Sequence, residues 1–232
     1  MALTFRICSI LVVCVFTAGA LHGQTYSQGQ YWCSITAEGN LPGPYKAALQ
    51  VESRTDLSER MLVNLFANLS VQREWSDYIS TELHYRVMVR DPGTDAEKAQ
   101  RLMLDLTGVK PIGKTTVSLR FRLGQEDEAG ADADGFFVSG GSAVFRQKLS
   151  VKRDIGRAQL SLSVEQFETI NRSGFNPDQL RVVLGSEFKV SKRQRISVFL
   201  MSQHLASGTN RLNFGTGYTY RFKSLKRKKS EQ

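Results

Sequence analysis

The stretch from Gln159 to Gln203 consists of segments in which apolar and polar residues alternate one by one. In the first segment, Leu160, Leu162 and Val164 are separated by polar side chains. Successive side chains of a strand leave opposite faces of the backbone, so this period of two predicts β-strands. One face is apolar, and the other carries charges that an ordinary protein core does not accept unpaired. Two folds satisfy this pattern: a soluble β-sandwich with the charged face in water, and a transmembrane β-barrel with the apolar face in lipid.

The same alternation recurs along most of the 232 residues, in segments of roughly nine to thirteen residues. A tilted strand needs about 9–11 residues to cross a membrane, whereas strands of soluble proteins are usually about five or six residues long. The connections also alternate in length, as in outer-membrane barrels with short periplasmic turns and long external loops. We therefore predict an all-β, antiparallel up-and-down transmembrane β-barrel. The short connections are 109–113, 152–156 and 191–194, and the long ones are 91–99, 125–141, 168–178 and 204–209.

The number of strands is less regular than the pattern within them. Eleven segments alternate, but bacterial single-chain barrels close with an even number of strands. A barrel of ten strands would begin at Tyr45, and residues 31–36 would then be a periplasmic extension or a plug. A barrel of twelve would add a short strand at Phe136–Val138. Both counts remain open.

The N-terminus is typical of a secretory signal, with Arg6 before an apolar run and small residues after it. Cleavage after Ala20 or Gly23 fits, and the latter divides the chain into a signal peptide (1–23), a barrel (24–222) and a basic disordered tail (223–232). Cys33 is then the only cysteine left, which excludes an internal disulfide framework. We expect the protein in the bacterial outer membrane of a Gram-negative cell.

The predicted inward face is strongly basic, in keeping with a net charge of +9 for the whole chain. A low-dielectric wall focuses such a field, which favours a porin-like, anion-preferring pore or a binding cavity for an acidic solute. The alternative is an interior of paired charges that simply fills a narrow barrel. The principal lumen residues expected are Arg86, Arg90, Arg101, Arg120, Arg122, Arg146, Lys148, Arg181 and Arg195. The basic set also includes Lys46, Arg54, Lys152, Lys189, Arg211 and Arg221, and the acidic residues are Glu52, Glu82, Asp105, Glu165 and Glu187.

Three of the acidic residues, Glu82, Glu165 and Glu187, are expected to form the acidic part of a lumen network. Glu165, Arg181 and Glu187 lie on neighbouring predicted strands and could join in one group of ion pairs. Such a group is more often structural than functional.

The histidines offer little sign of catalysis. Ser202 and His204 share one face near the end of a strand, as a nucleophile and a base would. Acyl transfer also uses a third group that orients the base, and no acid lies beside them on the last strand. His84 lies near Glu82 without a serine partner. We expect a non-enzymatic protein; the alternatives are a lipid- or lipopolysaccharide-modifying enzyme with Ser202 and His204, or a soluble exported ligand-binding barrel.

No cofactor or metal site is expected. The sequence Asp132-Ala-Asp-Gly135 fails as an EF-hand loop because glycines occupy its first and twelfth positions. Nucleic acid is a poor partner for an exported protein without a recognition motif. The partners expected are outer-membrane lipid and lipopolysaccharide, the barrel assembly machinery and small anionic solutes.

Several short motifs occur in order along the chain: Trp32, Glu52-Ser-Arg54, Tyr85-Arg86, Arg120-Phe-Arg122, Glu165-Gln-Phe167 and Gln179-Leu-Arg181 with Gly185. Their order and spacing resemble those of the domain-of-unknown-function family 2490, predicted outer-membrane β-barrels abundant in Bacteroidetes-type bacteria. The resemblance covers about Gln30 to Phe222 and implies the fold and the location, with no established reaction. The chain departs from the usual barrel C-terminus, because Phe222 is followed by a basic tail.

Overall fold

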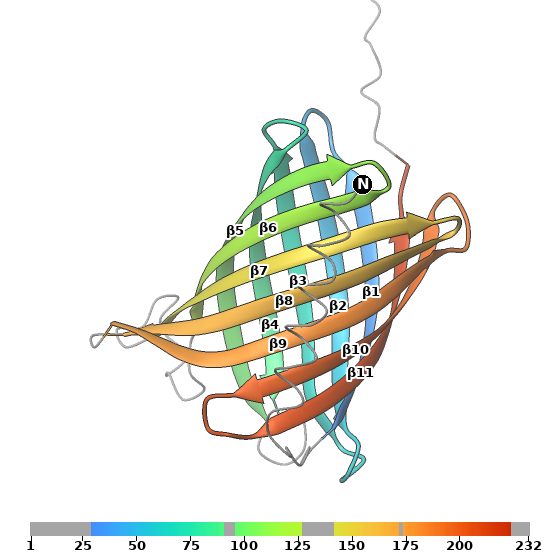
Figure 1. The fold of residues 1–232 in the computed structure, drawn as a ribbon. Coiled ribbons are helices and arrows are strands. Elements are labelled where there is room, and N and C mark those ends of the chain that lie inside the picture. Colours follow the sequence, from blue (N-terminus) through green and yellow to red (C-terminus); the bar gives the residue numbers. More distant parts are fainter. Residues whose placement is uncertain (1–28, 91–95, 127–141, 172–173, 224–232) are drawn as a thin grey trace, which may run out of the picture.

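The structure, a computed structural model, describes residues 29–90, 96–126, 142–171 and 174–223. These residues form eleven strands that close into one barrel (Figure 1). The strands are β1 (Gln30–Asn40), β2 (Tyr45–Asp56), β3 (Leu62–Glu74), β4 (Ile79–Arg90), β5 (Glu97–Ile112), β6 (Thr115–Glu126), β7 (Ser142–Ile155), β8 (Ala158–Asn171), β9 (Gly174–Lys189), β10 (Gln194–Leu205) and β11 (Asn210–Arg221).

Ten of the neighbouring strand pairs are antiparallel hairpins, and the barrel is closed by a parallel pairing of β1 with β11. Tyr31 lies opposite Phe214, and the pairing continues to Glu38 opposite Arg221. The expectation of ten or twelve strands is therefore wrong. The segment at 31–36, which the ten-strand alternative makes an extension or a plug, is part of β1 in the wall. An odd number of strands can close because the first and last strands run in the same direction.

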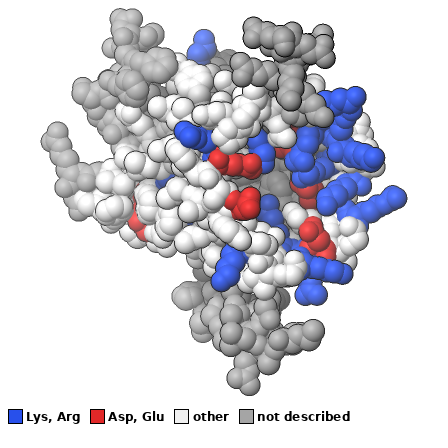
Figure 2. Space-filling model, turned by 90° about the horizontal axis from the view of Figure 1, so that it is seen from above, with Lys and Arg blue, Asp and Glu red and all other residues white. Residues whose placement is uncertain are grey.

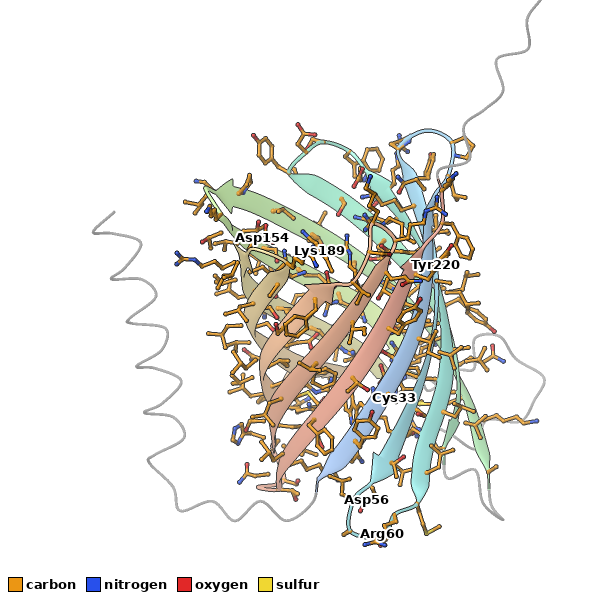
Figure 3. All side chains as sticks on the ribbon, turned by 90° about the vertical axis from the view of Figure 1, so that its right-hand side faces the viewer. Cys33, Asp56, Arg60, Asp154, Lys189 and Tyr220 are labelled. Atoms are coloured by element: carbon orange, nitrogen blue, oxygen red, sulfur yellow. The ribbon has the colours of Figure 1, made fainter. Side chains whose placement is uncertain are left out.

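The connection expected at 168–178 is also mostly strand. β8 and β9 pair as far as Asn171 opposite Gly174, with a register shift after Phe167 that accommodates the irregular sequence. The turns β1–β2, β3–β4, β5–β6, β7–β8 and β9–β10 and the end of β11 lie at one end of the barrel, called the short-turn end below. The start of β1 lies at the other end, together with the connections at 57–61 and 206–209. Figure 3 shows Asp154, Lys189 and Tyr220 at the short-turn end, and Asp56 and Arg60 at the opposite end.

The burial of side chains is inverted relative to a water-soluble core. The large apolar side chains exposed on the outer wall, such as Leu69, Leu104 and Leu184, outnumber the buried ones several-fold. Polar and charged side chains such as Asp105 and Asn213, with 1% and 0% of their surface exposed, lie inside. The alternation in the sequence is therefore realised as an apolar exterior and a polar interior.

In the described part of the chain, no helix is long and apolar enough to span a bilayer. The predicted signal peptide, the proposed strand at Phe136–Val138, the sequence 132–135 and most of the basic tail lie outside the described residues.

Candidate functional site in the barrel lumen

A large polar cavity lies in the lumen, toward the end of the barrel that carries the start of β1. It has a volume of about 490 Å³, within the usual range for small-molecule sites. Its charged lining is unbalanced, with nine basic side chains against two carboxylates. The basic residues are Arg54, Arg86, Arg90, Arg101, Arg120, Arg122, Arg146, Lys148 and Arg181, and the carboxylates are Glu52 and Glu165.

Aromatic rings hold several of these arginines in place. The guanidinium of Arg54 lies 3.6 Å from the ring centroid of Trp32 and 4.8 Å from that of Phe66. Arg86 lies 4.4 Å from the centroid of Phe66 on the same side of the lumen. Cations over ring faces are attracted by the ring quadrupole, and the planar guanidinium stacks well.

A second stacked group faces the first across the lumen. Arg146 and Arg181 lie 4.5 Å and 4.2 Å from the centroid of Phe167, and Arg181 also lies 5.7 Å from Trp32. Stacking occupies the flat faces of a guanidinium, whereas its N–H donors point outward in its own plane. The aromatic rings therefore pre-orient a set of donors around the cavity without neutralising their charge.

A buried ion-pair network forms the floor of this cavity. Arg122 donates from Nε to Oδ1 of Asp105 (2.5 Å) and from Nη2 to Oδ2 (2.7 Å). His84 Nε2 lies 3.3 Å from Asp105 Oδ2 and 3.2 Å from Arg122 Nη2. Bidentate arginine–carboxylate pairs are among the strongest side-chain contacts, so this floor is a rigid part of the lumen.

The network extends in both directions from Asp105. Glu82 lies 3.6 Å from His84, and Arg120 lies 3.6 Å from Asp105. Arg120 also donates to Glu165 at 2.6 Å. One group of charged side chains, from the four strands β4, β5, β6 and β8, thereby extends along the wall from β4 to β8.

The acidic groups and the imidazole in this network lie close enough to resemble a metal site. Ligand atoms of Glu82, His84 and Asp105 all lie within 4.8 Å of one another. However, both carboxylate oxygens of Asp105 accept hydrogen bonds from Arg122, and a cation would be repelled by the guanidinium. The donor set does not fit a metal ion.

Beyond the floor, a second chamber of about 330 Å³ opens toward the short turns. Its basic residues Lys46 and Arg221 are balanced by Glu38 and Glu82. On β3 the linings of the two chambers meet between Asn68 and Ser70, and on β4 between Glu82 and His84. His84, a member of the floor network, thus lies where the two linings meet.

Figure 2 looks onto this short-turn end and shows Lys and Arg side chains gathered along one side of it, with Asp and Glu side chains nearer the middle. The exposed basic residues at this end include Arg153 and Lys189, near the ends of β7 and β9, and Arg157 and Lys192 in the turns that follow these strands. They lie at the rim, outside both chambers.

A family model described as "Protein of unknown function (DUF2490)" matches residues 29–213. The chain belongs to the DUF2490 family. The match begins one residue before β1 and covers ten complete strands and the start of β11. No curated protein matches the chain.

Three solved structures are similar to the DUF2490 chain at low sequence identity. A NanC porin has a TM-score of 0.55 and 7% identity over 84% of this chain and 98% of its own. The translocator domain of the autotransporter NalP from Neisseria meningitidis has a TM-score of 0.47 and 16% identity, covering 78% of this chain and 76% of its own. A loop-deletion form of OmpT from Vibrio cholerae has a TM-score of 0.42 and 14% identity, covering 76% and 62%. The likeness to the NanC porin supports the barrel fold.

The structure brings most of the predicted lumen residues of the DUF2490 chain together. Eight of the nine principal basic residues line the large cavity. The ninth, Arg195, lies toward the short turns and donates to Glu187 at 3.1 Å. Glu82 and Glu165 belong to the network at Asp105, whereas Glu187 pairs separately with Arg195. Of the expected group of Glu165, Arg181 and Glu187, the first two lie directly opposite each other on β8 and β9. Glu187 is not part of that group, because its ion pair is with Arg195. Glu165 also has a partner that was not expected, Arg120, two strands away on β6.

Sequence reasoning missed the aromatic part of the site. Phe66 lies between Asn64 and Asn68 at the alternation positions that face inward, and it is 2% exposed. Phe199 also points inward, where its ring lies 6.1 Å from that of Trp32 and covers Gly215, which has no side chain to obstruct it. The sequence does indicate this, because both phenylalanines occupy positions of the alternation that are otherwise polar and therefore face the lumen.

Proposed function

We propose that the protein is an outer-membrane β-barrel whose lumen binds small anionic solutes. The membrane location is supported by the apolar side chains exposed around the wall and by strands of 11 to 16 residues, long enough to cross the hydrocarbon layer at a tilt. The fold likeness to the NanC porin agrees with this location.

The observation that carries the anion proposal is the excess of basic over acidic groups in the 490 Å³ cavity. In a narrow, low-dielectric lumen such charges repel one another strongly unless anions compensate them. Within the described residues, Nε of Arg86 is buried without a hydrogen-bond partner, and so is Nε of Arg120. Buried donors of this kind are costly unless an acceptor reaches them.

The position of the floor network, where the linings of the two chambers meet, supports holding a solute over free passage. A solute that enters the large cavity meets the network of Asp105, Arg122 and His84 before it reaches the second chamber. We therefore propose a binding cavity that is closed toward the short-turn end.

Thermal unfolding of the detergent-solubilised protein tests the anion proposal. A ligand that binds only the folded state stabilises it by RT ln(1 + [L]/Kd), about 2.7 kcal/mol at a hundredfold excess over Kd. Inorganic phosphate is expected to raise the melting temperature more than chloride does at the same ionic strength. Loss of the heat-modifiable band on a gel reports unfolding.

Two variants that each remove one positive charge separate site binding from general screening. Arg86→Gln removes a stacked guanidinium from the cavity and is expected to reduce the phosphate effect. Lys114→Gln removes an exposed charge from the β5–β6 turn and is expected to leave it unchanged. An equal response of both variants, or no difference between phosphate and chloride, would contradict the proposal.

A further inference from the structure

Outside the lumen, on the outer face of the wall, Ser202, His204 and Asn210 form a hydrogen-bonded chain. Ser202 Oγ lies 2.9 Å from His204 Nε2, and His204 Nδ1 lies 2.7 Å from Asn210 Oδ1. We propose that these residues form a second, catalytic site that hydrolyses acyl esters of membrane lipids. The site is separate from the proposed anion cavity and goes beyond that function.

Strand pairing explains why these three side chains meet. Ser202 and His204 are two residues apart on β10, so both project from one face. Asn210, at the start of β11, is the register partner of His204 across the hairpin. The side chains of directly opposed residues lie close enough to interact. A short hairpin of residues 206–209 fixes this register.

The hydrogen bonds select the form of the histidine that can act as a base. An amide oxygen only accepts, so Nδ1 of His204 carries the proton and donates it to Asn210 Oδ1. Nε2 is then unprotonated and accepts from the Ser202 hydroxyl. A serine, a base and a third residue that orients the base are the groups that nucleophilic acyl transfer requires, and an Asn in the third position occurs in cysteine proteases.

Ser202 and His204 lie on the outer surface of the barrel wall. Met201 and Gln203, the alternate residues of β10, are 2% and 6% exposed and point inward, so Ser202 and His204 point outward. Ser202 is flanked by Val182 and Leu212 on the neighbouring strands.

His204 is flanked by Leu180, another exposed apolar residue on the same face. A substrate that approaches this surface must itself be apolar next to its reactive bond. Acyl lipids meet that condition, because their ester groups join long alkyl chains to a polar head.

The proposed reaction balances as ester plus water giving carboxylic acid plus alcohol. Ser202 Oγ attacks the ester carbonyl carbon while its proton passes to His204 Nε2. The bond to the leaving alcohol breaks, and that alcohol takes the proton from Nε2, which leaves an acyl-serine. Water then attacks the acyl-serine, loses a proton to Nε2, and releases the fatty acid as Ser202 regains its proton.

From the sequence alone no enzyme is expected, because no acid lies beside Ser202 and His204. The structure supplies an amide instead. In the sequence, only the position of Asn210 indicates that it contacts His204. It is the first residue of the last strand, and a tight hairpin would place it opposite His204.

Release of fatty acid by the purified full-length protein tests the proposal. One assay uses mixed micelles of diacylphosphatidylglycerol and another uses purified lipopolysaccharide, which distinguishes the two sources of acyl ester. We expect release from one of them and its loss by at least about a thousandfold in Ser202→Ala and in His204→Ala, since such residues act as a unit. A fluorophosphonate probe is expected to label the wild-type serine and not Ser202→Ala.

Asn210 is a positioning residue, so its variants need a different comparison. Asn210→Ala is expected to slow both hydrolysis and labelling, and Asn210→Asp to restore them, because a carboxylate accepts the same hydrogen bond. Ser197→Ala, on the inner face of β10, is the control that should keep full activity. Heat-modifiable migration establishes that each variant is folded. Absence of release from both lipids, or equal release and labelling in folded Ser202→Ala, would overturn the proposal.

Discussion

Asp105 contacts more basic side chains in the lumen than any other carboxylate described in the structure does. It is 1% exposed and contacts Arg122, Arg120 and His84. Glu187, in contrast, makes a half-exposed pair with Arg195 at 3.1 Å. Removal of one partner from a buried pair leaves an uncompensated charge, whereas an exposed pair contributes little.

The variant Asp105→Asn is therefore expected to destabilise the barrel by about 3–5 kcal/mol, the usual cost of breaking a buried pair. Urea unfolding in lipid vesicles measures this change. Glu187→Gln is the matched control and is expected to cost less than about 1 kcal/mol. Equal losses in the two variants would show that the Asp105 network is not a central support of the lumen.

At this scale the sequence predicts which side chains face inward, because the period of two assigns a face to every residue of a strand. It does not predict which of them pair. The contact of Glu165 with Arg120 joins β8 to β6, and it depends on the tilt and stagger of the strands. Those quantities are set by closure of the whole barrel.

Among the elements, β1 is the one that defines the topology. Its parallel pairing with β11 closes the wall, so the first and last strands begin at the same end. All eleven segments are visible in the sequence as alternating runs. The predicted count of ten or twelve is wrong because the rule of even strand numbers holds for all-antiparallel barrels, whereas this barrel closes with a parallel pair.

A cross-link tests this closure. Cys33 and Thr216 are register partners on β1 and β11 and both point outward, and Figure 3 shows Cys33 on this part of the wall. Neighbouring strands lie about 4.8 Å apart, within reach of a disulfide. With Cys8 and Cys14 changed to serine, Thr216→Cys is expected to form a disulfide with Cys33 on mild oxidation, seen as faster migration of the unfolded chain.

Val198→Cys provides the control for this cross-link. Val198 is the other register partner of Thr216, on β10, so it is two strands from Cys33 and beyond disulfide distance. It is expected to remain unlinked. If Thr216→Cys failed to cross-link in the folded protein, β1 and β11 would not be neighbours.

At the scale of the whole molecule, the barrel wall has two faces that differ in chemistry. The inner side holds a basic cavity, and the outer side is apolar, with Ser202 and His204 near one end. Both proposed sites depend on lipid contacting the outer side. Lipid supplies the substrate of one site, and the low-dielectric surroundings strengthen the field in the other.

The choice between lipid and water outside the wall is open to direct measurement by sedimentation velocity of the purified protein, with and without detergent. We predict a folded, monodisperse species only when detergent or lipid is present, and aggregation when detergent is removed, because the exposed leucines and valines would then meet water. A protein that stays folded and monodisperse in detergent-free buffer would contradict the membrane location, and with it the account of both sites.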